Sequence, residues 1–172
     1  MGNKVAQELI FKYKGRSTPF IELPESAQMA LIHYKAIDGE LWDLSPELGA
    51  YFIQDNNAGS IKTKLLSIIK SSLPWYINKY GHEQFGYALI PLEEIADGIM
   101  RCEQGRDYLS FKEYHEAYIS CGDVPYHPPI SLWPVIFSSN GYELLEDGWH
   151  RLHSYYRSQV PIIPVVYSFF CS

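Results

Sequence analysis

The sequence predicts an α+β fold, with a small mixed sheet, packed helices and a mainly helical segment before them. Two observations support this class. Apolar residues recur at helical spacing in the first half, whereas short runs of β-branched and aromatic residues, bounded by Gly, Pro and Asn, stand out in the second. A length of 172 residues, 47% hydrophobic and 20% charged, suffices for one buried core. We therefore expect a single domain over residues 1–172, helical over 1–84 and sheet-bearing over 85–172.

The first half of the chain is predicted to be mainly helical after its first 20 residues. Residues 1–20 are compatible with one strand or a loose basic arm. A helix is expected from about Glu25 to Ile37, where Ala27, Leu31 and their neighbours repeat at helical spacing. An amphipathic helix is expected over Ile61–Ser71, with another helical turn beginning at Pro74.

The second half begins with a predicted strand, Tyr87–Leu92, whose Pro91 indicates an edge strand or a strand end. Glu93–Gly98 is expected to form a turn. Ser110 can cap a helix from Phe111 to about Tyr118. A proline-rich connector, Cys121–Pro129, should then lead into the next strand.

The chain is organised around residues 133–167. Two short runs, Pro134–Phe137 and Tyr142–Leu145, are rich in residues that favour β-strands. They flank Ser138–Gly141, and the Asn-Gly pair in that segment is a strong hairpin signal. Asp147 can cap a following helix, which Val160 and Pro161 end. A buried strand over Ile162–Tyr167 completes a hairpin, helix and strand unit.

Charge is distributed unevenly along the chain. The net charge is −6, and residues 87–172 carry five Lys or Arg against eleven Asp or Glu, while residues 1–86 carry nine of each. Duplex DNA binding requires several cations that neutralise phosphates, so nucleic acid is not expected as a partner. The N-terminus lacks a secretory signal, no apolar run is long enough to span a membrane, and the three cysteines are scattered. We expect a cytoplasmic protein with reduced thiols.

The start of the predicted helix has the features of a phosphate site. Gly148 allows close approach, the backbone N–H groups after it lack intrahelical acceptors, and His150 and Arg151 add cations. The same residues also admit a structural interpretation, in which Asp147 caps the helix and Arg151 pairs with a carboxylate such as Glu146. Both interpretations remain open at this stage.

Three segments resemble the ParB/sulfiredoxin-like superfamily over residues 86–168: Asp147–Leu152, Ile163–Val166 and Ile90–Ile95. Members place a Gly-x-His-Arg or Gly-x-Arg-Arg motif at a helix start, where it holds nucleotide phosphates. The Asp-Gly-x-His-Arg pattern is similar to that of members acting as small-molecule kinases or nucleotidases. Trp149 stands where sulfiredoxins have their reactive cysteine, which argues against reductase chemistry.

The resemblance implies two sets of site residues. Ligand contacts are expected from the motif and the histidine that follows it: Asp147, Gly148, Trp149, His150, Arg151 and His153. Phosphoryl transfer also needs a carboxylate that orients the nucleophile and usually a divalent ion, so Glu93, Glu94 and Asp97 are the catalytic candidates, with a nucleoside triphosphate and Mg²⁺ as cofactors. His150 and His153 lie three residues apart, but a zinc site needs further ligands, and we assign no resident metal site.

The sequence thus predicts a protein that binds a nucleotide or another phosphorylated small molecule, and leaves open whether it is a phosphotransferase or nucleotidase. The alternative is a non-catalytic regulatory or protein-interaction protein, of the kind mobile elements carry, in which the motif is structural. Such a protein would bind another protein or a second copy of itself.

Overall fold

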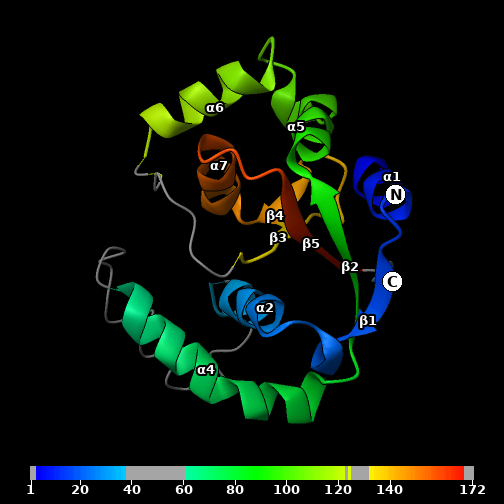
Figure 1. The fold of residues 1–172 in the computed structure, drawn as a ribbon, viewed down its shortest axis with the longest axis vertical. Coiled ribbons are helices and arrows are strands. Elements are labelled where there is room, and N and C mark those ends of the chain that lie inside the picture. Colours follow the sequence, from blue (N-terminus) through cyan, green and yellow to red (C-terminus); the bar gives the residue numbers. More distant parts are fainter. Residues whose placement is uncertain (1–2, 38–60, 123, 125–131, 169–172) are drawn as a thin grey trace. The chain divides into compact units, whose positions relative to one another are not determined.

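The computed structural model describes residues 3–37, 61–122, 124 and 132–168 (Figure 1). The chain divides into two compact units, one formed by residues 1–18 and 84–172 and the other by Pro19–Glu83. The first unit contains all the predicted site residues. Within the described residues, no helix is both long and apolar enough to cross a membrane.

The first unit is built on a five-stranded mixed sheet with the order β1-β2-β5-β3-β4. Its strands are β1 (Arg16–Pro19), β2 (Gln84–Pro91), β3 (Val135–Phe137), β4 (Leu145–Asp147) and β5 (Ile162–Ser168). Strand β5 runs antiparallel to β2 and parallel to β3, and β3 is antiparallel to β4. The α+β class is therefore confirmed. Pro91 ends β2, which is an inner strand, so the strand-end prediction is correct and the edge prediction is wrong.

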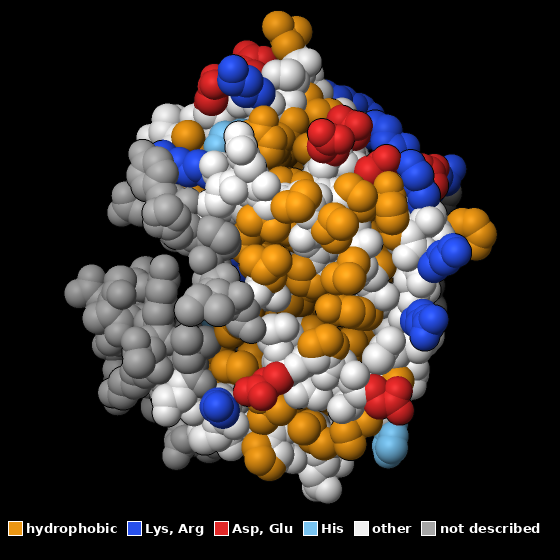
Figure 2. Space-filling model, viewed as in Figure 1, with side chains coloured by type: hydrophobic (Ala, Val, Ile, Leu, Met, Phe, Trp, Pro, Cys, Tyr) orange, Lys and Arg blue, Asp and Glu red, His pale blue; other side chains and the backbone are white. Residues whose placement is uncertain are grey.

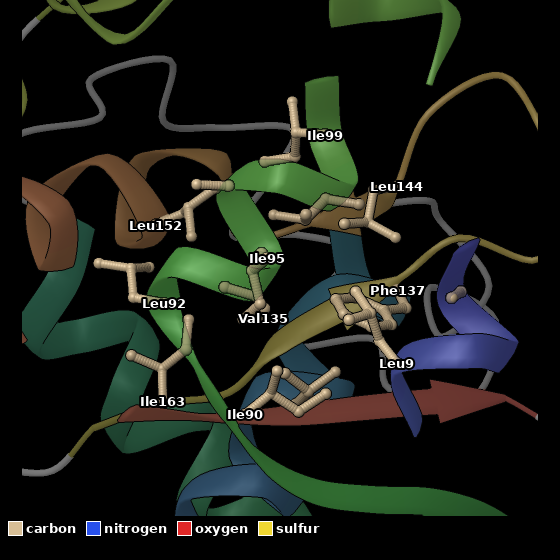
Figure 3. Packing of buried hydrophobic residues seen from close by; sticks show 14 of the residues in the cluster. Leu9, Ile90, Leu92, Ile95, Ile99, Val135, Phe137, Leu144, Leu152 and Ile163 are labelled. Atoms are coloured by element: carbon tan, nitrogen blue, oxygen red, sulfur yellow. The ribbon is translucent and has the colours of Figure 1, made fainter. Parts of the chain in front are cut away.

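Helices cover this sheet. Helices α1 (Lys4–Lys12) and α5 (Leu92–Arg101) contact β2, α7 (Trp149–Arg157) contacts β3, and α6 (Phe111–Ser120) packs against α5 and α7. Figure 3 shows the resulting core, in which Ile90 and Ile163 of the sheet lie below Ile95 of α5 and Leu152 of α7. All four side chains are fully buried, and this burial is the main source of stability for the unit.

Two elements of this unit differ from the prediction. Within residues 1–20, Arg16–Pro19 form strand β1, which agrees with the strand prediction, but residues 4–12 form helix α1. The Asn3 side chain caps this helix by accepting a hydrogen bond from the Ala6 N–H at 3.1 Å. Asn3 also donates from Nδ2 to the Glu143 carbonyl at 2.8 Å, which fastens α1 to the β3–β4 connection. The expected turn at 93–98 is instead part of α5, and its Ile95 and Ile99 face the core.

The hairpin is present, but its second strand begins at Leu145, later than predicted. The Asn140-Gly141 pair does not adopt the left-handed conformation of a two-residue hairpin turn, because among the described glycines only Gly148 has positive φ. Asn140 acts through its side chain, and its Oδ1 accepts the Tyr142 N–H at 3.0 Å. Ser110 caps α6 as predicted, with its Oγ 3.2 Å from the Glu113 nitrogen.

In its described residues, the second unit contains the short 3₁₀ helix η1 (Phe20–Glu22) and two packed helices, α2 (Glu25–Ile37) and α4 (Ile61–Tyr80). The bounds of α2 are those predicted. Helix α4 is longer than predicted and continues through Pro74. Tyr76, which is fully buried two residues after the proline, stabilises this continuation, since the centre of its ring lies 4.4 Å from that of Phe20.

Candidate functional site

The sharp entry from β4 into α7 depends on Gly148. Its φ of 96° is left-handed, and a Cβ at this position would lie 3.1 Å from both the Val135 Cα and the Arg151 Nη2. Gly148 itself is the residue before the first helical turn, and no side chain caps the helix there. The predicted cap at Asp147 is therefore wrong, because Asp147 ends β4 opposite Ile136.

Arg151 is bound inside the fold. Its Nη2 donates a hydrogen bond to the Pro134 carbonyl at 3.0 Å and lies 3.5 Å from Oδ2 of Asp147. The guanidinium carbon is 5.9 Å from the centre of the Trp133 ring, within the range of a cation–π contact. Only 18% of the Arg151 side chain is exposed, so its contacts fasten α7 to the segment that leads into β3. Tyr155 adds a second link, a 2.8 Å hydrogen bond from its hydroxyl to the Trp133 carbonyl.

His150 has the opposite environment. It is exposed, and it lines a pocket of about 380 Å³ between α6 and α7, next to the end of α6. The other lining residues come from α6 and the segments that flank it: Tyr108, Tyr114, Ala117, Tyr118, Cys121 and Gly122. Figure 1 shows α6 alongside α7 in this unit. Within the motif, His150 is therefore the side chain available to a ligand in this pocket.

A group of aromatic rings lies behind the pocket. The Tyr118 ring stacks on that of His153 with centroids 3.8 Å apart and planes 13° apart, and the His150 ring meets Tyr118 edge-on at 5.6 Å. Trp149 meets Tyr114 edge-on at 6.3 Å and packs against the core. Trp149 thus joins α7 to α6 and does not line the pocket.

Two buried histidines connect α6 and α7. The Nδ1 atoms of His115 and His153 are 2.7 Å apart, so one imidazole donates a hydrogen bond to the other. Burial, followed by the neighbouring His115 and His150, lowers the pKa of His153 to about 3. Burial also lowers the pKa of His115, together with the Arg157 charge, and Glu116 opposes the shift. Both rings are therefore neutral at neutral pH.

His153 differs from its sequence interpretation as a ligand contact. It is completely buried, does not line the pocket and packs behind Tyr118. The Nε2 atom of His153 is also buried and has no hydrogen-bond partner among the described residues. Sequence spacing could not reveal the pair, since its members lie 38 residues apart.

The three catalytic candidates lie on α5 and do not line the pocket. Glu94 accepts a hydrogen bond from Lys12 of α1 at 2.9 Å, which lowers the pKa of the Glu94 carboxyl. Glu93 and Asp97 are exposed. The structure therefore does not bring these carboxylates to His150, and across the described ranges it contains no cluster of three or more His, Cys, Asp or Glu arranged to hold a metal ion.

Charged residues around α1 and α5 occur in pairs of opposite sign. Lys12 pairs with Glu94, and Arg101 pairs with Glu8 at 2.8 Å. Figure 2 shows the same mixture on the face in view, where blue Lys and Arg side chains lie among red Asp and Glu side chains. This mixed distribution adds no support for a nucleic-acid partner.

Comparisons with known protein families, curated proteins and solved structures find no match to this chain. The resemblance to the ParB/sulfiredoxin-like superfamily accordingly stays a prediction, and function has to be argued from the site itself.

Proposed function

We propose that this chain binds a phosphorylated small molecule or a nucleotide at the start of α7, where His150 contacts the ligand. The observation that carries the proposal is the position of His150, exposed in the first turn of a nine-residue helix and on the wall of a 380 Å³ pocket. Pockets of this volume suit small molecules. The first-turn N–H groups and the helix dipole favour an anionic group near the start of α7, where an imidazole N–H of His150 could donate a hydrogen bond to it.

The proposal assigns binding and no reaction. Phosphoryl transfer needs a carboxylate that orients the nucleophile, and usually Mg²⁺, next to the bound phosphate. Glu93, Glu94 and Asp97 do not line the pocket, and Glu94 is engaged with Lys12. The chemistry of a phosphotransferase or nucleotidase therefore finds no support in their positions.

A second candidate function is a regulatory or protein-interaction role in which the motif is structural. The internal contacts of Arg151 with Pro134 and Asp147 favour this candidate. Leu89 and Ile162, which are 58% and 50% exposed, lie on the same face of the paired strands β2 and β5 and would suit contact with another protein. The first candidate predicts that an added nucleotide raises the Tm of the chain, and the second predicts that it does not.

A thermal-shift titration tests the first candidate. We would titrate ATP, CTP, GTP and ADP, each with and without Mg²⁺, into the wild type, His150→Ala and Lys112→Ala. Lys112 is an exposed α6 residue outside the pocket, and its variant controls for the loss of a surface cation. A ligand at about 100 times its Kd adds about 2.7 kcal/mol, a rise of about 5–10 °C in Tm for a chain of this size.

We expect this rise for at least one nucleotide in the wild type and Lys112→Ala, and a much smaller rise in His150→Ala. Equal rises in all three proteins would place the ligand elsewhere and contradict the role of His150. No rise with any nucleotide, combined with a lower Tm of ligand-free Arg151→Ala, would favour the second candidate.

A further inference from the structure

The pocket beside His150 is aromatic, and its other lining side chains among the described residues carry no formal charge. Three tyrosines, Tyr108, Tyr114 and Tyr118, form most of its wall together with Ala117. We propose that this pocket takes an uncharged planar aromatic ring, so that the ligand of the site carries an aryl or heteroaryl group. This inference rests on the proposed function only for the position of the ligand's phosphate.

Stacking geometry supports an aromatic occupant. The rings of Phe111 and His153 are nearly parallel, 6° apart in plane with centroids 5.9 Å apart, and the Tyr118 ring continues the series. His153 covers one face of Tyr118 and does not line the pocket, so the pocket meets Tyr118 at its other face or at its edge. A planar ring of the ligand on that side of Tyr118 would add one ring to the row formed by Phe111, His153 and Tyr118. It would contact Tyr118 in the offset or edge-on geometry that aromatic rings prefer.

The tyrosine wall is held in place before any ligand binds. Gln104 donates from Nε2 to the Tyr114 hydroxyl at 3.1 Å, and Tyr108 meets Tyr114 edge-on at 5.1 Å. A wall fixed in this way loses little conformational entropy on binding, which favours a rigid ligand of matching shape.

The local charges favour an uncharged ring in the pocket. Burial raises the pKa values of Tyr114 and Tyr118, and the nearby carboxylates of Glu143 and Asp147 raise them further. The hydroxyls therefore stay neutral and able to donate hydrogen bonds. The same carboxylates disfavour an anionic ring in the pocket.

Calorimetric titrations with four probes test the inference: indole and adenosine, which have a ring without phosphate, ribose 5-phosphate, which has a phosphate without an aromatic ring, and AMP, which has both. Ala117→Phe fills the pocket from α6. Glu116→Phe adds the same side chain at the neighbouring exposed position, outside the pocket, and is the matched control. Tyr118→Leu keeps apolar volume and removes the stacking surface, while Tyr108→Ala removes a partly buried side chain of the wall.

We expect indole or adenosine to bind the wild type and Glu116→Phe with the same affinity, and AMP to bind more tightly than adenosine. Ala117→Phe should weaken ring binding at least tenfold, and Tyr118→Leu should weaken it by about tenfold. Circular dichroism of each variant would verify its fold. If Ala117→Phe or Tyr118→Leu unfolds, Tyr108→Ala replaces it and should weaken ring binding several-fold.

The probes separate this inference from the proposed function. Binding of ribose 5-phosphate without binding of indole or adenosine would overturn the aromatic-ring inference and leave the phosphate proposal standing. Binding of the ring compounds, with AMP no tighter than adenosine, would support the inference and count against the phosphate. If no probe binds, or if ring binding is unchanged in every pocket variant, the inference is overturned.

Discussion

His150 and Arg151 are consecutive residues of one motif with opposite environments. Arg151 points into the fold, where it contacts Pro134 and Asp147, whereas His150 is exposed on the wall of a pocket. Successive residues of an α-helix are rotated by about 100°, so one first turn can face both the sheet and a ligand. The residue types of such a motif therefore do not reveal which of its side chains are structural.

Loss of the Arg151 side chain should have the largest effect on stability. Arg151→Ala removes a charged hydrogen bond and leaves the Pro134 carbonyl and the Asp147 carboxylate without their partner, at a cost of about 2–3 kcal/mol. Urea unfolding would measure this as a lower free energy of unfolding. Arg151→Lys keeps the charge but not the planar guanidinium, and should recover only part of the loss.

A contrary result would change the assignment of the two residues. If Arg151→Ala unfolds within about 0.5 kcal/mol of the wild type, the range of an ordinary surface substitution, its internal contacts contribute little. Arg151 would then be free to turn toward a phosphate, and the distinction drawn from the geometry would fail.

Substitution of Gly148 at the entry into α7 should lower the free energy of unfolding nearly as much as loss of the Arg151 side chain. Gly148→Ala forces a Cβ into a left-handed residue and against the Val135 backbone, which should cost about 1–3 kcal/mol. Gly141→Ala is the matched control, because Gly141 lacks a positive φ and has open space where its Cβ would lie. We would measure the free energies of unfolding of the two variants and expect a lower value for Gly148→Ala. Equal values would show that the strain at Gly148 is relieved elsewhere.

Acid should weaken the contact between α6 and α7. An unfolded histidine titrates near pH 6.5, but the pKa of His153 in the folded chain is about 3, so between these values the unfolded state binds the extra proton. The free energy of unfolding therefore has its full value above pH 6.5. It falls as the pH is lowered from there toward 3, by up to about 1.4 kcal/mol per pH unit.

Unfolding free energies at pH 7 and pH 5 would measure this loss, which should be about 2 kcal/mol for His153, with a further contribution from His115, whose pKa is lowered in the same direction. His153→Gln should be less stable than the wild type at pH 7 and show a smaller change between the two pH values. The same pH dependence in His153→Gln would assign the acid sensitivity to other groups.

Local sequence signals predicted much of the sheet-bearing unit. The strand over Ile162–Tyr167 and the cap at Ser110 depend on residues adjacent in the chain, and both are present. Helix α1 was missed although a local signal existed, the Asn3 cap followed by buried Ala6, Leu9 and Ile10.

The candidate site was less predictable, because its geometry depends on long-range contacts. The sequence predicted a site at the α7 start, but it could not show that Arg151 meets the carbonyl of Pro134, 17 residues away. It also could not show that the tyrosines of α6 and its flanks form the pocket wall beside His150. Side-chain direction in the first turn of a helix depends on the angle at which the preceding strand enters it, which here is set by Gly148.

The smallest effect on stability is expected at His150, where the proposed effect on binding is largest. His150→Gln replaces an exposed side chain, so the free energy of unfolding should change by no more than about 0.5 kcal/mol. The same variant should lose affinity for a phosphorylated ligand, because His150 is the motif side chain on the pocket wall. Titrations of both proteins with AMP would measure this. A variant that binds AMP as tightly as the wild type would remove the imidazole from the site and leave the pocket's tyrosines as the basis of recognition.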